Sequence, residues 1–377
     1  MMHSKTLLAL AAAALLAGAT AARAQEFNAS IWFPDTHPLT KYGYLDWAKR
    51  VETASNGQMK VKVFTGTALL PPTAHLSGLR DGIAQLTYHA GTYTPTDLPE
   101  DNVVSTLGLG VGDTIATTFA VTDFYMTDPE MQARFRSLGI VFAGGYATPP
   151  YNLMCTKKVA TLADLKGLKI RMPAVIHADW AKSVGAVPVN VPSSEMFSGL
   201  EKGQIDCAAN AANDMKSRSL WDVAKHTSQI SLGLYWAGWE WAFNGKFWKD
   251  LKPENRRLLL DSIADTIPIM TLGYMKDSAD ALREAPAKGV TVYPESDDMK
   301  KSIAAFAANV ARAQAIEQGT SKFKLKNSAD LVKRFEAAVA KWDGLLKGVD
   351  RNNPQALAKL LKDNLYSKID AKTYGVY

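Results

Sequence analysis

Apolar and polar residues alternate with two different periods in the first part of the chain. The segment 59–64 (MKVKVF) is apolar at every second position, which predicts a strand with one buried face. Between residues 39 and 54 the apolar positions lie three or four apart, which predicts an amphipathic helix. The apolar segments 27–33 and 83–90 predict two more strands, and a helix precedes the second of them. This order predicts parallel strands with helices packed on both faces of a sheet.

The same alternation begins again in the middle of the chain. Helical periodicity at 176–184 and 193–203 is followed in each case by an extended segment, at 187–192 and 204–210. Residues 149–238 are therefore predicted to form a second α/β domain, and two or three amphipathic helices follow toward the C-terminus.

A glycine-rich segment at 107–113 (LGLGVGD) lies in the first predicted domain. It lacks the lysine and the spacing of a phosphate-binding loop. It is therefore interpreted as a surface turn.

Ligands of α/β sheets bind beside the carboxyl ends of the strands. In the first predicted domain those ends are 32–37, 66–72 and 89–93. His37 and His89 lie in two of these segments, so each is a candidate to face a ligand. A packed or surface histidine is the plainer alternative for both.

The N-terminus has the features of a secretory signal peptide. Lys5 precedes an apolar run from Thr6 to about Gly18, and Ala22 to Ala24 supply a small-residue cleavage site. Residues 1–24 are therefore predicted to be removed, and the mature protein to be soluble and periplasmic, secreted across the inner membrane.

Charge and cysteine content narrow the classes of partner. The formal net charge is +6, and two of the basic residues lie in the leader. No block of five like charges occurs, so a nucleic-acid footprint is not predicted, while an anionic small molecule fits the mild charge without being required. Cys155 and Cys207 are too few for a disulfide framework, and the sequence leaves open whether they pair in an oxidising compartment.

Motifs of exported enzymes are missing from the sequence. It contains no G-x-S-x-G, no H-E-x-x-H and no convincing pair of carboxylates, and its six histidines show no metal spacing. No catalytic residue, metal ion or cofactor is therefore predicted.

Several motifs stand in a fixed order between residues 161 and 210. They are TLADLKGLKIRMPA (161–174) and GAVPVNVPSSEMFSGLEKGQIDCAAN (185–210). This run resembles the solute-binding proteins of tripartite ATP-independent periplasmic (TRAP) transporters, of the C4-dicarboxylate-binding, DctP-like type. Asn56-Gly57 before a strand and segment 244–251 before a long helix extend the resemblance over most of the mature chain.

The resemblance implies a two-lobed, periplasmic-binding-protein-like α/β fold. Mixed sheets flanked by helices would form the lobes, a long helix would brace both, and a hinge would close the cleft on the ligand. Lobe I would comprise residues 25–148 plus about 239–285. Lobe II would comprise residues 149–238 plus about 286–377, including C-terminal helices that pack on their own lobe or on a second subunit of a homodimer.

The resemblance also assigns roles to two polar residues. Arg171 matches the arginine that clamps the ligand carboxylate, a role that suits the two-pronged guanidinium. Asn210 matches the asparagine that hydrogen-bonds the same carboxylate. Tyr151 stands where some relatives carry a second arginine, which suggests a ligand with one carboxylate.

Further cleft residues are expected on the same basis. Phe33, Tyr151 and Trp236 would form an aromatic wall that suits an apolar or aromatic body. Trp239, Trp241 and Phe243 share one strand face and are interpreted as core. The other candidates to contact the ligand are Tyr88, His89, His37 and Ser193.

The sequence thus predicts a TRAP solute-binding protein that captures an organic acid and delivers it to two membrane subunits. An exported hydrolase, or a binding protein that serves an ABC importer, are the alternatives.

Overall fold

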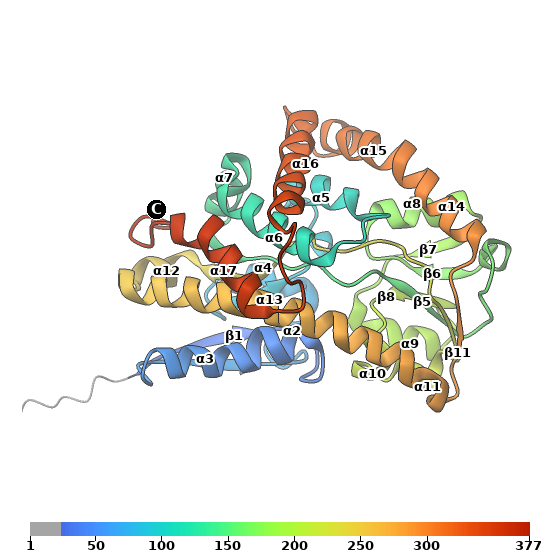
Figure 1. The fold of residues 1–377 in the computed structure, drawn as a ribbon, viewed down its shortest axis with the longest axis horizontal. Coiled ribbons are helices and arrows are strands. Elements are labelled where there is room, and N and C mark those ends of the chain that lie inside the picture. The colour runs from blue at the N-terminus through green and yellow to red at the C-terminus, as the bar shows by residue number, and fades with distance from the viewer. Residues whose placement is uncertain (1–23) are drawn as a thin grey trace, which may run out of the picture.

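A computed structural model describes residues 24–377 of the chain. All but the last residue of the predicted signal peptide lies outside these described residues. Within them, two β-sheets form the centres of two lobes, and helices cover both (Figure 1).

The sheet of lobe I is mixed. β1 pairs in parallel with β2 and β3, as the alternation of strands and helices predicts. β10 runs antiparallel to β3 and β4, and it enters this sheet after the chain has passed through lobe II. In spatial order the strands are β2 (Met59–Phe64), β1 (Gln25–Ser30), β3 (Leu86–His89), β10 (Trp239–Asn244) and β4 (Ile140–Gly144).

The sheet of lobe II is mixed as well. β6 pairs in parallel with β7 and β8, while β5 runs antiparallel to β8 and β9. In spatial order the strands are β11 (Thr291–Tyr293), β9 (His226–Ser228), β5 (Asn152–Cys155), β8 (Cys207–Asn210), β6 (Lys169–Arg171) and β7 (Val187–Val189).

Helices flank each sheet, as the fold class predicted. Those of lobe I are α2 (Pro38–Thr40), α3 (Asp46–Ala54), α4 (His75–Arg80), α5 (Pro99–Ser105), α6 (Thr114–Thr127), α7 (Pro129–Ser137) and α12 (Gly245–Asp250). Those of lobe II are α8 (Val175–Ser183), α9 (Met196–Glu201), α10 (Asp214–Ser217), α11 (Leu220–Val223) and α14 (Asp297–Phe306).

A single long helix braces the two lobes. α13 (Pro253–Glu284) crosses from one lobe to the other in Figure 1. On lobe I, the indole Nε1 of Trp47 donates to Ser262 Oγ at 2.9 Å. On lobe II, Lys216 pairs with Glu284 at 2.9 Å. By length and composition this helix is apolar enough to cross a membrane, but 61% of its apolar window is buried inside the protein.

The C-terminal helices correct one predicted domain boundary. We expected residues 286–377 to belong to lobe II, yet α16 (Ser328–Leu345) and α17 (Pro354–Asn364) pack on lobe I and α13 (Figure 1). Asp123 of α6 holds α16 against lobe I, because its buried carboxylate accepts hydrogen bonds from Lys341 and Trp342 of α16. α15 (Arg312–Glu317) carries the chain from lobe II to this position.

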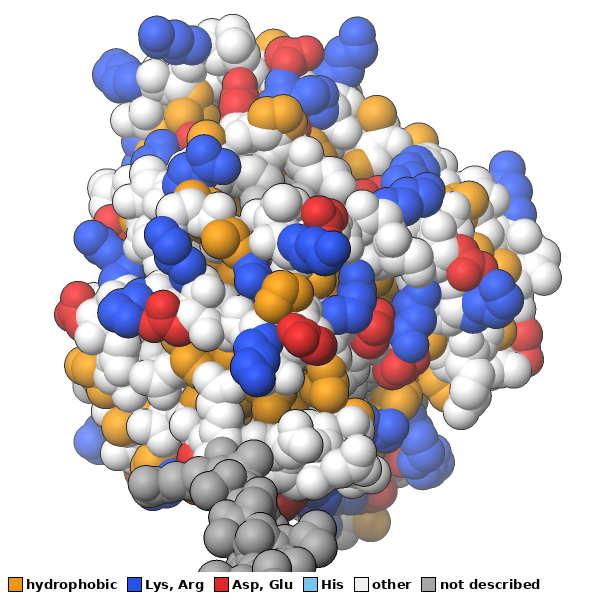
Figure 2. All heavy atoms as spheres, turned by 90° about the vertical axis from the view of Figure 1, so that its left-hand side faces the viewer, with side chains coloured by type: hydrophobic (Ala, Val, Ile, Leu, Met, Phe, Trp, Pro, Cys, Tyr) orange, Lys and Arg blue, Asp and Glu red, His pale blue; other side chains and the backbone are white. Residues whose placement is uncertain are grey.

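Figure 2 shows the end of lobe I in space-filling view. Cationic and acidic side chains lie side by side on this face, and small groups of hydrophobic side chains lie between them. Charges of both signs mixed in this way are ordinary for a solvated surface.

Candidate functional site

The two lobes enclose a small cavity at the carboxyl ends of their strands. β6 ends at Arg171 and β8 ends at Asn210, while β1 and β3 lead into the lobe I wall. The free space is about 20 Å³, which holds about one water molecule. An organic ligand therefore enters only when the lobes part. The lining residues are Trp32, Phe33, His37, Leu39, Tyr88, Ala90, Tyr93, Tyr146, Thr148, Tyr151, Arg171, Pro173, Ser193, Asn210, Tyr235 and Tyr274.

Arg171 is a buried cation whose guanidinium is held by backbone oxygens. Its Nε donates to Val191 O at 3.1 Å and its Nη1 donates to Ala209 O at 3.0 Å. Arg171 is 3% exposed, and no carboxylate of the described chain lies within 4.0 Å of its guanidinium. A buried charge is costly without an opposite charge. An anion in the cavity would supply the missing opposite charge.

Asn210 is engaged within its own lobe. Its Nδ2 donates to Asp214 Oδ2 at 2.6 Å, and its Oδ1 accepts from the backbone of Ala211 at 3.1 Å. The side chain lines the cavity. Its contact with a ligand carboxylate stays a prediction.

Aromatic rings make up most of the cavity wall. Phe33 stacks on His37 with ring centres 4.1 Å apart, and Tyr151 stacks on Tyr235 at 6.2 Å. The Tyr88 hydroxyl lies 2.6 Å from that of Tyr146. Burial raises the pKa of Tyr88 and of Tyr151, so both phenols stay neutral. Of the predicted aromatic wall, Phe33 and Tyr151 line the cavity, and so do the other candidates Tyr88, His37 and Ser193.

Lobe I and lobe II touch directly beside this cavity. The Tyr93 hydroxyl accepts from the backbone N–H of Ser193 at 2.9 Å and lies 3.5 Å from Arg171 Nη2. His37 Nδ1 accepts from the backbone of Leu39, so its proton is on Nε2, which faces Asp214 Oδ1 at 3.5 Å. Burial first, and then the charge of Arg218, hold the pKa of His37 well below its ordinary value. The two lobes therefore meet through the contact between Tyr93 and Ser193 and through the neutral imidazole of His37, which faces Asp214.

Two charged residues of the site escaped the sequence analysis. Asp214 is the first residue of α10, and Arg218 directly follows that helix. Arg218 Nε lies 3.2 Å from Asp214 Oδ2, so the two side chains form an ion pair. Burial raises the pKa of the Asp214 carboxyl, while the charge of Arg218 opposes the rise. Neither residue stands in a motif, so the sequence carries no signal that separates them from surface charges.

The prediction that His89 faces the ligand is wrong. Its Nε2 lies 2.8 Å from Thr94 Oγ1, and its ring packs 4.9 Å from that of Trp239. Successive side chains of a strand point to opposite faces. Because Tyr88 faces the cavity, its neighbour His89 points into the core of lobe I.

The prediction that Trp236 faces the cleft is also wrong, because its ring packs on α16 and away from the cavity. Its ring stacks on Phe335 of α16 with centres 5.6 Å apart, and it lines a separate hollow with Leu107 and Leu109. Tyr235, one residue earlier, faces the cavity instead. The many aromatic residues at 235–243 indicated that this segment lies near the cleft, but not which way each ring points.

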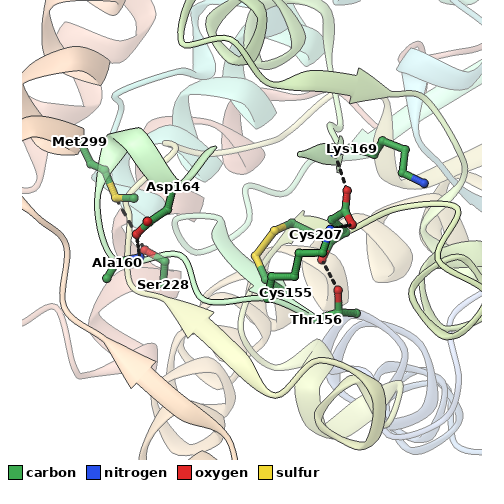
Figure 3. The surroundings of a disulfide bond; sticks show 10 residues. Cys155, Thr156, Ala160, Asp164, Lys169, Cys207, Ser228 and Met299 are labelled. Carbon is green, nitrogen blue, oxygen red and sulfur yellow. Dashed lines mark hydrogen bonds and ion pairs between the residues drawn. A yellow bond between two sulfur atoms is a disulfide. The ribbon is translucent and has the colours of Figure 1, made fainter. Parts of the chain in front are cut away.

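A disulfide joins Cys155 to Cys207, which the sequence left open. The two cysteines are register partners in β5 and β8, and Figure 3 shows the bridge between these strands. β8 continues to Asn210, and Tyr151 directly precedes β5. The bridge therefore fixes two strands that bring residues to the cavity.

Comparison with protein families decides the identity of the fold. A family model of bacterial extracellular solute-binding proteins, family 7 (DctP), matches residues 29–318. The chain belongs to this family. The predicted family is thereby confirmed, and the likeness to solved structures confirms the two-lobed fold. The family 7 assignment places the chain among binding proteins that act outside the cytoplasm.

Solved structures with this family 7 fold include two TRAP solute-binding proteins. One, from a marine metagenome, is specific for aromatic acid ligands and holds metahydroxyphenylacetate; it has a TM-score of 0.75 and 22% identity, over 85% of this chain and 99% of that chain. Another, from Rhodoferax ferrireducens, holds copurified benzoate; it has a TM-score of 0.76 and 20% identity, over 85% and 99%.

Curated relatives agree with the family 7 assignment. A solute-binding protein of Albidiferax ferrireducens is 26% identical over 67% of this chain and 74% of its own length. The C4-dicarboxylate-binding protein DctB of Bacillus subtilis is 26% identical over 58% of this chain and 62% of its own length.

Proposed function

We propose that this solute-binding protein captures an organic acid with an apolar or aromatic body in the periplasm and delivers it to the membrane subunits of a TRAP transporter. The observation that carries the proposal is Arg171, a buried guanidinium at the cavity with no acidic partner among residues 24–377.

The free N–H groups of Arg171 suit a carboxylate. Backbone oxygens occupy Nε and one N–H of Nη1, which fixes the plane of the guanidinium. A guanidinium has five N–H donors, and a third, on Nη2, is directed at the Tyr93 hydroxyl at 3.5 Å, so one N–H on each Nη atom remains available to a carboxylate. Charge-assisted pairs of this geometry are strong where water is excluded. Arg171 thus anchors the acid group, and Asn210, whose amide nitrogen carries a second hydrogen beside the one donated to Asp214, is its proposed partner at the cavity.

The rings around the cavity suit the body of the ligand. Phe33, Tyr88 and Tyr151 offer flat apolar faces, and Tyr235 adds another from the connection between the lobes. Aromatic faces stack well on planar ligands and on sugar rings. Benzoate and metahydroxyphenylacetate bound to proteins of the same fold support an aromatic acid as the first class to try.

Binding then proceeds by lobe closure without chemistry on the ligand. The contact between Tyr93 and Ser193 forms only when the lobes meet, so a ligand that bridges them favours the closed state. A hydrolase would return an altered molecule, and a receptor for an ABC importer would fail to support uptake through TRAP membrane subunits. Release of the unchanged acid and uptake by reconstituted TRAP subunits are the expected results.

A thermal-shift screen tests the proposal. Aromatic acids, aliphatic monocarboxylates, dicarboxylates, keto acids and sugar acids are each added to the mature protein. A ligand at a hundred times its Kd adds about 2.7 kcal/mol of stability, which gives a clear rise in Tm. Stabilisation by at least one acid is expected; no stabilisation by any class of carboxylate would overturn the proposal.

A further inference from the structure

A second arginine lies behind the cavity wall and carries an acidic partner of its own. Arg218 Nη2 donates to Ser193 Oγ at 3.2 Å, and its guanidinium carbon lies 4.9 Å from the centre of the Phe33 ring. Its side chain is 9% exposed and pairs with Asp214. Because Phe33 and Ser193 line the cavity, the charge of Arg218 is close enough to act on a ligand.

Asp214 is fixed in place as the counter-ion of this arginine. The residue is 1% exposed, and donors surround both of its oxygens. Burial raises the pKa of this carboxyl, and the hydrogen bonds and the charge of Arg218 oppose that rise by favouring the ionised form. The donors are Asn210 Nδ2 at 2.6 Å, Ser217 Oγ at 2.8 Å, and Asn213 Nδ2 and Arg218 Nε each at 3.2 Å. His37 Nε2 lies 3.5 Å from Oδ1.

The charged side chains around the cavity therefore sum to one positive charge, that of Arg171. Arg171 has no acid within 4.0 Å in the described chain, whereas Arg218 is paired with Asp214. The imidazole of His37 is neutral. A ligand with one carboxylate brings this enclosed region to zero net charge.

We propose that Asp214 restricts the cavity to acids with a single carboxylate, by cancelling the charge of Arg218 and leaving Arg171 as the cation that the ligand neutralises. This inference rests on the proposed capture of an organic acid. A second carboxylate in the closed cavity would lie near Asp214 without a free cation, and desolvating it would be uncompensated.

The test compares each diacid with its own half-ester, which has nearly the same size and one charge fewer. Isophthalate is paired with monomethyl isophthalate, and succinate with monomethyl succinate. Kd values are measured by isothermal titration calorimetry for the wild type, for Asp214→Asn and for the double variant Asp214→Asn/Arg218→Gln. Circular dichroism confirms that each variant is folded.

The wild type is expected to bind at least one half-ester ten-fold or more tighter than the matching diacid. Asp214→Asn frees Arg218 and should reduce that ratio by ten-fold or more. The double variant returns the net charge to one and should restore the ratio. If Asp214→Asn does not fold, Arg218→Gln alone carries the test, because it leaves Asp214 unpaired and should weaken half-ester binding by ten-fold or more.

Failure of this inference differs from failure of the proposed function. Wild-type protein that binds half-ester and diacid equally well overturns the role of Asp214, and so does an unchanged ratio in folded Asp214→Asn. Wild-type protein that binds no carboxylate in these pairs or in the thermal-shift screen overturns the proposed function and this inference with it.

Discussion

The hydroxyl of Tyr93 on lobe I accepts a hydrogen bond from the backbone N–H of Ser193 on lobe II at 2.9 Å. The same hydroxyl lies 3.5 Å from Nη2 of Arg171, so the two lobes meet directly beside the proposed anchor. In the proposed function, lobe closure and ligand anchoring are therefore coupled through the side chain of Tyr93.

Tyr93→Phe should weaken ligand binding without unfolding the protein. It removes the hydroxyl that joins the lobes, and one net hydrogen bond corresponds to about a two- to ten-fold loss of affinity. Isothermal titration calorimetry with the best acid from the screen measures the effect. Tyr42→Phe is the matched control, because its hydroxyl contacts Asp277 away from the cavity, and it should bind normally. Equal affinities in the two variants would show that Tyr93 does not hold the closed state.

Removal of the disulfide should destabilise the fold. The bridge closes a loop of 52 residues, for which chain entropy predicts a loss of up to about 4 kcal/mol of unfolding free energy. Urea unfolding of Cys155→Ala/Cys207→Ala measures it as a lower midpoint. A midpoint equal to that of the wild type, with the same slope, would contradict a bridge between β5 and β8.

The packing of α16 on lobe I is tested through one shared carboxylate. Asp123 accepts from Trp342 Nε1 at 2.9 Å inside the core and also pairs with the half-exposed Lys341. Trp342→Phe should cost about 1–3 kcal/mol because it takes a donor from a buried acid. Lys341→Ala should cost less than about 1 kcal/mol because water replaces the ammonium. Urea unfolding compares the two, and similar small losses would argue that α16 lies elsewhere.

Acid should destabilise the protein through its buried histidines. Burial lowers the pKa of His89 to about 3, whereas the unfolded chain binds that proton near pH 6.5. Between these values the unfolded state binds more protons, so the free energy of unfolding falls as the pH falls below about 6.

A variant that lacks His89 isolates the contribution of this one residue. In His89→Gln the dependence of stability on pH should be shallower by up to about 1.4 kcal/mol per pH unit between pH 6 and pH 4. Urea midpoints across that range measure it. His226→Gln serves as the control, because it removes an imidazole that is only partly buried. A slope in His89→Gln as steep as the wild-type slope would contradict a neutral, buried His89.

Local pattern predicted much of the scaffold that positions the site. Strict alternation at 59–64 gave β2 with its observed bounds, and helical spacing at 39–54 gave the segment from α2 to α3. Local pattern alone is equally typical of a surface arginine on a strand edge, so the placement of Arg171 at the cavity came from the resemblance to TRAP solute-binding proteins.

Orientation and long-range partners were beyond the sequence. Tyr88 and His89 are equally polar-aromatic neighbours, as are Tyr235 and Trp236, so composition could not set which of each pair faces the cavity. α16 has an apolar stripe, but the stripe does not say which lobe will cover it. The segment 107–113 resembled a surface turn, yet Gly108 is buried against the backbone of Leu234. Asp214 and Arg218 meet the cavity only through tertiary contacts.

The central claim is that Arg171 holds the carboxylate of the ligand. Arg171→Met removes the charge while filling the space, so the unliganded protein should remain as stable as the wild type. Arg171→Lys keeps a charge but lacks the two-pronged geometry. Arg80→Met, at an exposed position, is the control.

The deciding measurement is isothermal titration calorimetry of these variants with the acid that gives the largest thermal shift. Arg171→Met should lose a hundred-fold or more in affinity, Arg171→Lys ten-fold or more, and Arg80→Met nothing. Folded Arg171→Met that binds the acid within three-fold of the wild-type affinity would contradict the account.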